Sequence, residues 1–276
     1  MTIKEIDQYL EEGNSLKQIA QAYSEIANQK LKRIRIEVER NRIFFDEISK
    51  VYSLVRAIAI KKGIILPKTK KRICILQTSN FRFYGNINSS IIEFFISQTK
   101  DLDTHRVIIG KTGIEYFQAN KLFEFTPFVF KNDHPSPAEL NAFVSVVKSY
   151  SQILIFYSRL KSLLVQLPVV TDITETSQNI STDEKNNLQF IFEPEIAKTL
   201  DFFDNQILVL LIEQAFLEAE VARTASRFIS MDTAETEANK YIKQYSSLKA
   251  YSERNLTNNQ LLESISSILA VRRGGQ

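Results

Sequence analysis

Apolar residues recur every three or four positions over two long stretches of the chain. In the C-terminal stretch, Asp201–Ala270, the recurring positions are Ile207, Leu210, Gln214, Leu217, Val221, Thr224, Phe228, Met231, Glu235, Ala238, Ile242 and Tyr245. The stretch contains neither Gly nor Pro. The pattern therefore predicts one continuous helix of about 100 Å, because each helical residue adds ~1.5 Å. A helix of this length needs a partner that covers its apolar seam.

The second stretch with this spacing runs from about Leu16 to Lys61, and it predicts a long N-terminal helix. Gly63 and Pro67 follow its end, as is usual after a helix. Two long helices with similar apolar stripes can cover each other. We therefore expect them to form an antiparallel coiled coil.

Between the two stretches, short apolar runs alternate with shorter helical patterns. Pro127 restricts one of these runs to a sheet edge or a bend, and Ser136, Pro137 and Glu139 form a capping box that opens a helix. The predicted strands are 73–79, 106–110, 123–130, 152–160, 162–170 and 188–193, and the predicted helices are 89–98, 113–119 and one from 136. Alternating strands and helices predict a Rossmann-like α/β sheet domain with several parallel strands.

The expected fold is thus α/β, with a long antiparallel coiled coil and a central sheet domain. We expect residues 1–66 to form the N-terminal helix, residues 67–193 the central domain, and residues 194–276 the C-terminal helix that pairs with residues 1–66.

Composition limits the classes of protein to which this chain can belong. The chain has 276 residues, of which 44% are hydrophobic, and a net charge of +3, which is too weak to argue for nucleic acid. A single cysteine, Cys74, excludes an internal disulfide. The charged start lacks a signal-peptide core, and the longest apolar runs are too short to span a membrane. We therefore expect a cytoplasmic protein.

Residues that could carry chemistry do not combine into a site. Gly110-Lys111-Thr112 follows a predicted strand like the end of a phosphate-binding loop, but the earlier Gly of that motif is replaced by His105. His105 and His134 have no Cys or carboxylate at metal-ligand spacing. We expect no catalytic residue, no cofactor site and no metal site.

Basic residues cluster on both predicted long helices. One cluster contains Lys30, Lys32, Arg33 and Arg35, and the other contains Arg223 and Arg227, one turn apart. A solubilising face and a contact with an acidic protein partner both fit these clusters. Nucleic acid fits less well, because aromatic residues are not interleaved with the basic ones.

The order of these motifs resembles that of the gamma subunit of F-type rotary ATPases. Residues 19–33 (IAQAYSEIANQKLKR) are similar to the first-helix motif of that family, and residues 107–117 (VIIGKTGIEYF) to its Val-Ile-Gly-x-Lys-Gly element. Residues 156–170 resemble the strand pair of the family. In the last helix, Leu217, Glu218, Arg227, Met231, Ala234 and Ala238 match the family's pattern.

The chain also departs from the family pattern in three places. The family's Ser-Asp-Arg-Gly-Leu-Cys-Gly-Gly segment corresponds to residues 78–86, which have lost glycines and the acidic residue. Arg223 stands where a Glu is usual, and the end of the chain near Arg254 keeps the family motif only faintly. The resemblance therefore points to a divergent member.

The resemblance implies that the coiled coil is the rotor shaft inside a ring of alternating alpha and beta subunits, which carry the catalytic sites. It implies a foot formed by the central domain, an epsilon-type subunit bound there, a membrane rotor ring as a further partner, and a location at the cytoplasmic face of a membrane. As ring contacts we predict Lys30, Lys32, Arg33, Arg223, Arg227, Met231 and Arg254. As foot contacts we predict Arg82, Tyr84 and Asn88.

Two alternative functions follow from the same residues. The altered segment 78–88 suggests a gamma-like shaft of a specialised motor that hydrolyses ATP for transport or other mechanical work. The helical pattern by itself also fits a free-standing coiled-coil scaffold.

Overall fold

A computed structural model describes residues 2–61, 70–174 and 196–273. Its contacts divide the chain into two compact units, which are described separately: residues 27–227, and residues 1–26 together with 228–276. Both predicted boundaries of the central domain, at residues 66 and 193, lie outside the described residues, as does the predicted strand 188–193. None of the described helices is long and apolar enough to cross a membrane.

The two long helices are α1, Ile3–Lys61, and α6, Ile196–Arg273. The two helices confirm the prediction made from the spacing of apolar residues. Every recurring position of the C-terminal seam is buried or half-buried. The predicted start of α1 near Leu16 is wrong, because the helix begins at Ile3. Gly13 lies inside the helix, where a glycine normally weakens it. A Cβ at Gly13 would lie 3.0 Å from Ile242 Cγ1, so the missing side chain allows a close helix–helix approach.

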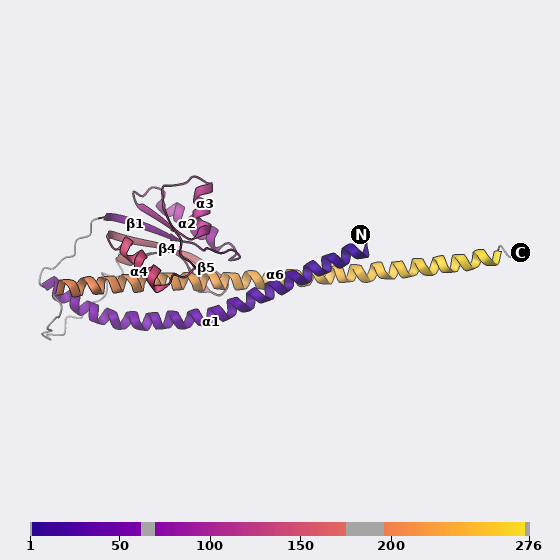
Figure 1. The fold of residues 1–276 in the computed structure, drawn as a ribbon, viewed down its shortest axis with the longest axis horizontal. Helices are drawn as coiled ribbons and strands as arrows, with labels where there is room; N and C mark the ends of the chain where they lie inside the picture. Colours follow the sequence, from indigo (N-terminus) through magenta and orange to yellow (C-terminus); the bar gives the residue numbers. More distant parts are fainter. Residues whose placement is uncertain (1, 62–69, 175–195, 274–276) are drawn as a thin grey trace. The chain divides into compact units, whose positions relative to one another are not determined.

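The central sheet contains five strands in the order β3-β2-β1-β4-β5 (Figure 1). The strands are β1 (Lys70–Gln77), β2 (His105–Ile109), β3 (Thr126–Phe128), β4 (Tyr150–Ser162) and β5 (Val165–Asp172). The first four are parallel, and β5 runs antiparallel to β4. The prediction of a mainly parallel sheet is therefore confirmed, and Pro127 lies in the edge strand β3, as a residue without an N–H requires.

Three short helices connect the strands: α2 (Ile87–Thr99), α3 (Lys111–Ala119) and α4 (Pro137–Val147). The predicted capping box opens α4. The backbone N–H of Glu139 donates to Ser136 Oγ, and the carboxylate of Glu139 accepts from the backbone N–H of Ser136 at 2.8 Å. These bonds satisfy helix N–H groups that would otherwise lack a partner.

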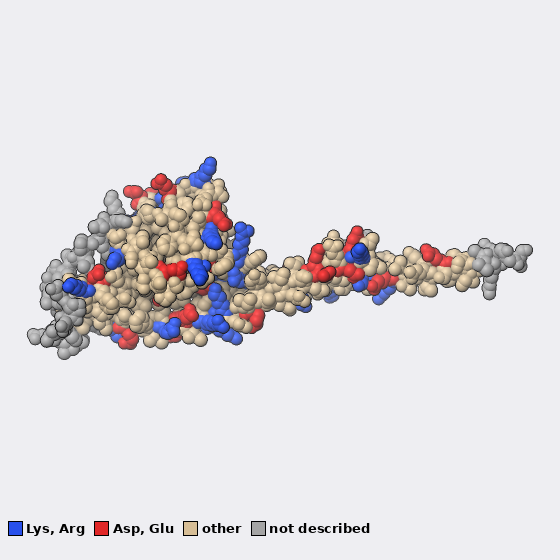
Figure 2. Space-filling model, viewed as in Figure 1, with Lys and Arg blue, Asp and Glu red and all other residues tan. Residues whose placement is uncertain are grey.

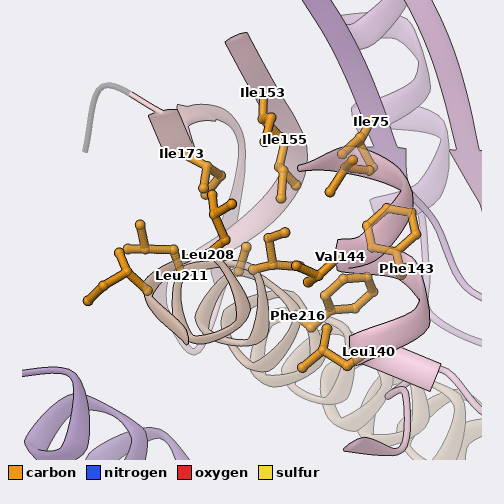
Figure 3. Close-up of a cluster of buried hydrophobic side chains, with 14 of the residues drawn as sticks. Ile75, Leu140, Phe143, Val144, Ile153, Ile155, Ile173, Leu208, Leu211 and Phe216 are labelled. Atoms are coloured by element: carbon orange, nitrogen blue, oxygen red, sulfur yellow. The ribbon is translucent and has the colours of Figure 1, made fainter. Parts of the chain in front are cut away.

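Each face of the sheet has its own apolar core, because side chains alternate along a strand. From β1, Cys74 and Leu76 point toward α2 and α3, where they pack with Phe95 and Phe117. Ile73 and Ile75 point to the opposite face, which α4 and α6 cover. Figure 3 shows this second core, in which Phe143 of α4 and Phe216 of α6 meet the strand isoleucines.

Within the unit of residues 27–227, α1 and α6 pack antiparallel. Leu31 and Ile34 of α1 pack with Leu217, Val221 and Ala225 of α6. Further along the pair, Asn41 Nδ2 donates to Glu213 at 3.1 Å and the Tyr52 hydroxyl to Asp204 at 2.6 Å. Rising numbers in α1 thus meet falling numbers in α6, which confirms the antiparallel direction.

The unit of residues 1–26 and 228–276 consists of the other parts of the same two helices. The rings of Tyr9 and Tyr245 lie 5.0 Å apart. Lys249 pairs with Asp7 at 2.6 Å, and Gln21 Nε2 donates to Glu235 at 2.7 Å. Glu235, which interrupts the apolar seam in the sequence, therefore has a polar partner on α1.

Candidate functional site: a polar junction of helices and sheet domain

Charged residues gather on one face of α6, close to the sheet domain. Glu220, Arg223 and Arg227 are three and four positions apart, so they lie along the same side of the helix. Glu220 is 1% exposed and Arg223 is 2% exposed. Together with Lys30, Tyr84, Asp133 and Ser226, these residues form what we call the polar junction.

Glu220 is the centre of the polar junction. Arg223 donates to its Oε2 from Nη2 at 2.8 Å and from Nε at 3.2 Å. Lys30 of α1 forms an ion pair with the other carboxylate oxygen of Glu220. Burial opposes the ionisation of Glu220, but the charges of Arg223 and Lys30 outweigh it and lower the pKa to about 2. The carboxylate is thus ionised at neutral pH and links the two long helices.

Asp133 connects the polar junction to the sheet domain. Its carboxylate accepts from the Tyr84 hydroxyl at 2.6 Å and from the backbone N–H of Asn80. The backbone carbonyl of Asp133 accepts from Arg223 Nη2 at 3.3 Å. Burial and the carboxylate of Asp133 raise the pKa of Tyr84 well above its usual value, so the phenol remains a hydrogen-bond donor.

The loop before α2 is held against α6 from a second direction. The guanidinium of Arg227 lies 4.0 Å from the centre of the Tyr84 ring and donates to the backbone carbonyl of Arg82 at 3.1 Å. Ser226 Oγ donates to the Tyr84 carbonyl at 2.7 Å. Phe83 adopts a φ of +67°, which few residues with a side chain favour. The bonds from α6 therefore hold a strained turn in place.

A second polar cluster lies beside a cleft of about 370 Å³ in the same unit. Glu218 Oε2 of α6 accepts from the Tyr157 hydroxyl and from Arg159 Nε, both of β4, each at 2.8 Å. Arg42 and Asp46 of α1 line the other side of the cleft. This cluster gives α6 a further set of bonds to the sheet domain.

The Gly110-Lys111-Thr112 segment has a structural role in the described chain. Gly110 has a φ of +96°, and a Cβ there would lie 2.5 Å from the Thr78 carbonyl oxygen. The backbone N–H groups of Lys111, Thr112 and Gly113 donate to Asn80 Oδ1, the Ser79 carbonyl and Thr78 Oγ1. These donors, which would bind a phosphate in a nucleotide-binding loop, are already used.

The structure brings several of the predicted contact residues into the polar junction. Lys30, Arg223, Arg227 and Tyr84 belong to it. Arg223 and Tyr84 are each 2% exposed, so their side chains are inside the unit and not at its surface. Both side chains bond to partners within the chain, Arg223 to Glu220 and Tyr84 to Asp133.

The other predicted contact residues lie outside the polar junction. Lys32, Arg33, Arg82 and Arg254 have exposed side chains, and Met231 is 9% exposed. Asn88 is half-buried, and its Nδ2 donates to Ser79 Oγ at 2.8 Å. Figure 2 shows Lys and Arg gathered along one edge of the broad part of the face in view and mixed with Asp and Glu elsewhere on it.

Sequence reasoning missed Glu220 and Asp133. Glu220 precedes Arg223 by one helical turn and lies among apolar seam residues, which is a signal for a buried ion pair. Asp133 gave no such signal, because its partners Tyr84 and Arg223 are far away in the sequence. Among the described residues, no group of His, Cys, Asp and Glu is arranged to hold a metal ion.

Comparison with known proteins gives one consistent family. A family model described as ATP synthase matches residues 2–267. The ATP synthase gamma chain of Buchnera aphidicola subsp. Melaphis rhois is 21% identical, over 98% of each chain. The ATP synthase gamma chain of Clostridium botulinum (strain Eklund 17B / Type B) is 26% identical, over 85% of this chain and 86% of its own.

Solved structures agree in fold. A chain of the Euglena gracilis mitochondrial ATP synthase, from a structure of OSCP, F1 and the c-ring, has a TM-score of 0.65 at 14% identity, covering 99% of this chain and 96% of its own. A chain from the central stalk and c-ring of the Tetrahymena thermophila mitochondrial ATP synthase has a TM-score of 0.58 at 18% identity. It covers 78% of this chain and 99% of its own.

Proposed function

This chain belongs to the ATP synthase family, and on that premise we propose that it is the gamma-type central shaft of a rotary F-type ATPase. As a gamma-type subunit it is not itself catalytic. It couples rotation to ATP synthesis or hydrolysis at sites on other subunits. Its contribution is mechanical, and it requires a stiff helix pair with a firmly attached domain.

The polar junction is the observation that carries this function. Torque applied to the sheet domain reaches α6 only if the domain and the helix do not slide past each other. Glu220, Arg223 and Asp133 supply directional bonds between buried groups, and such bonds resist sliding more than an apolar contact does. Lys30 extends the same set of bonds to α1, so both helices of this unit follow the domain.

The partners we propose are the alpha and beta subunits of a catalytic ring. The exposed cations Lys32, Arg33 and Arg254 fit contacts with acidic ring segments, and Met231 fits an apolar one. At the foot, we propose that Arg82 and Asn88 meet an epsilon-type subunit, with a membrane rotor ring as a further partner. The complex would then lie at the cytoplasmic face of a membrane. Arg223 and Tyr84 act from inside the chain.

The alternatives are less well supported. The curated relatives carry the name ATP synthase gamma chain, which favours a synthase over a specialised motor that only hydrolyses ATP. The family match over residues 2–267 likewise favours a subunit over a free-standing scaffold. Substitutions in the segment 78–88 concern a turn whose bonds are made within the chain, to Asp133 and α6.

Co-purification from the native cell tests the proposal. A tag on this chain should recover alpha-type and beta-type ATPase subunits in a fixed ratio of three each to one, as mass spectrometry of the intact complex would measure. The complex should hydrolyse ATP, and the isolated chain should not. Recovery of this chain without either ATPase subunit would reject the shaft function.

A further inference from the structure

The outward side of α1 carries an apolar stripe that no described residue covers. Ile36 is 70% exposed, Ile43 57%, Phe44 51% and Val51 47%. Ile36 precedes Ile43 by seven positions and Phe44 by eight, and Val51 follows Phe44 by seven, so the four residues lie along one side of the helix. A shallow hollow of about 680 Å³ follows part of this side. We call these four residues the outer stripe, and all of them belong to the unit of residues 27–227.

Two opposite charges lie on the same side as the outer stripe. Arg40 precedes Ile43 by three positions, and Glu47 follows Phe44 by three. Both line the hollow. Arg40 makes no ion pair with another of the described residues, and Glu47 pairs only with its helical neighbour Lys50, at the surface. Exposed pairs of this kind contribute little, so Glu47 is available to another cation.

The order of these residues is symmetric about the point between Ile43 and Phe44. When two such helices lie antiparallel and a two-fold axis passes near that point, positions equally far from it meet. Arg40 then meets Glu47 of the second copy, and Ile36 lies near Val51 of the second copy. At the centre, Ile43 of each copy meets Phe44 of the other copy. A two-fold contact of this kind needs a surface that is complementary to itself.

We propose that two copies of the free chain associate through the outer stripe, with their α1 helices antiparallel and Arg40 paired with Glu47 of the second copy. An acidic partner helix would match Arg40 but would oppose Glu47, and a basic one would do the reverse. A second copy matches both charges at once.

The size of the contact sets the expected affinity. The stripe from Ile36 to Val51 runs along roughly 22 Å of helix. A contact of this length buries less area than the ~1,600 Å² of a standard interface. The dimer is therefore weak, with a dissociation constant in the micromolar range. This association concerns the chain outside the ring, so it does not depend on the shaft function.

Charge reversal with rescue tests the antiparallel pairing. Arg40→Glu and Glu47→Arg should each raise the dissociation constant of the purified full chain about tenfold or more, because each creates two like-charge contacts. The double variant Arg40→Glu/Glu47→Arg should return it to within about threefold of the parent, because both pairs are restored with exchanged signs. Sedimentation equilibrium at low salt measures these constants.

Lys17→Glu is the matched control. It makes the same charge change on α1, but about five turns before Ile36 and outside the symmetric set, and it should leave the dissociation constant unchanged. Two results would overturn the proposal: a parent chain that remains monomeric at about 200 µM, well above a micromolar dissociation constant, or a double variant that associates no better than the single ones. Circular dichroism of each variant verifies that α1 remains helical.

Discussion

At the scale of single residues, the ion pairs of Glu220 matter most for the stability of the chain. Its carboxylate is buried and has two cationic partners, one on its own helix and one on α1. Forming such a cluster is costly because Glu220 and Arg223 leave water, and the attraction between the charges offsets the cost. Removal of one member therefore affects stability more than the cluster itself contributes.

Glu220→Gln should lower the free energy of unfolding by about 3–5 kcal/mol, because it takes from the buried Arg223 the carboxylate to which it is hydrogen-bonded. Urea unfolding followed by circular dichroism measures the change. The double variant Glu220→Leu/Arg223→Met serves as the control, since it removes both buried charges and should be more stable than the single variant. Equal loss in both variants would contradict the assignment of a buried ion pair.

The low pKa of Glu220 also predicts how stability depends on pH. The pKa in the folded chain is about 2, below the ordinary value of 4.5. As the pH falls, the unfolded chain therefore takes up this proton at a higher pH than the folded chain does. The stabilisation from ionised Glu220 is complete above pH 4.5. It declines as the pH falls from 4.5 toward 2. Glu220→Gln should flatten the acid limb of the stability curve in this range, as urea titrations at each pH would record.

At the scale of secondary-structure elements, the apolar spacing was sufficient to predict the long helices but not all their bounds. The α6 seam is apolar at most positions, and the structure covers every one of them. The first turns of α1 were missed for a local reason. Gly13 argues against a helix, and its close packing against Ile242 overrides that preference. Thr2 and Glu5, which form a capping box at the start of the helix, were the signal that could have placed this start.

Val221 offers a test of the continuous helix α6. It is 9% exposed and packs with Leu31 and Ile34 of α1. Val221→Pro should destabilise the chain by ~3 kcal/mol or more and prevent assembly, because proline removes a helical hydrogen bond and clashes with the preceding turn.

Val221→Ala is the control for that change, because it keeps the helix and removes only part of the side chain, at about 1–2 kcal/mol. Thermal unfolding of the chain and recovery of the ATPase complex provide the two measurements. A Val221→Pro variant that assembles and hydrolyses ATP at the parent rate would be incompatible with a continuous shaft.

At the scale of the whole molecule, the family could be identified from the order of its motifs, whereas the polar junction could not. Arg223 and the Asp133 carbonyl are 90 positions apart, and Ser226 and the Tyr84 carbonyl are 142 apart. Spacing rules relate residues within one helix or strand, so they could not place Arg223 next to the sheet domain. Arg223 therefore seemed available to an outside partner, although it is buried within the chain.

The exposed cations now provide the better test of ring contact. Lys32→Glu/Arg33→Glu should change the ATPase rate of the assembled complex by about threefold or more, while the melting temperature of the isolated chain stays within about 2 °C, because both side chains are exposed. Arg223→Glu is the contrasting variant, since it places two buried carboxylates together and should lower the melting temperature. An unchanged ATPase rate in the first variant would remove Lys32 and Arg33 from the contact surface.

The pairing of the first helix with the last also has a consequence for synthesis on the ribosome. Gln21 and Glu235, which bond to each other, are 214 positions apart. At about 5–20 residues per second, the ribosome needs on the order of ten to forty seconds to translate the segment between them. During that time the part of α1 around Gln21 lacks its partner from the same chain. We expect chaperones that hold apolar helices to bind the nascent α1 until α6 is translated.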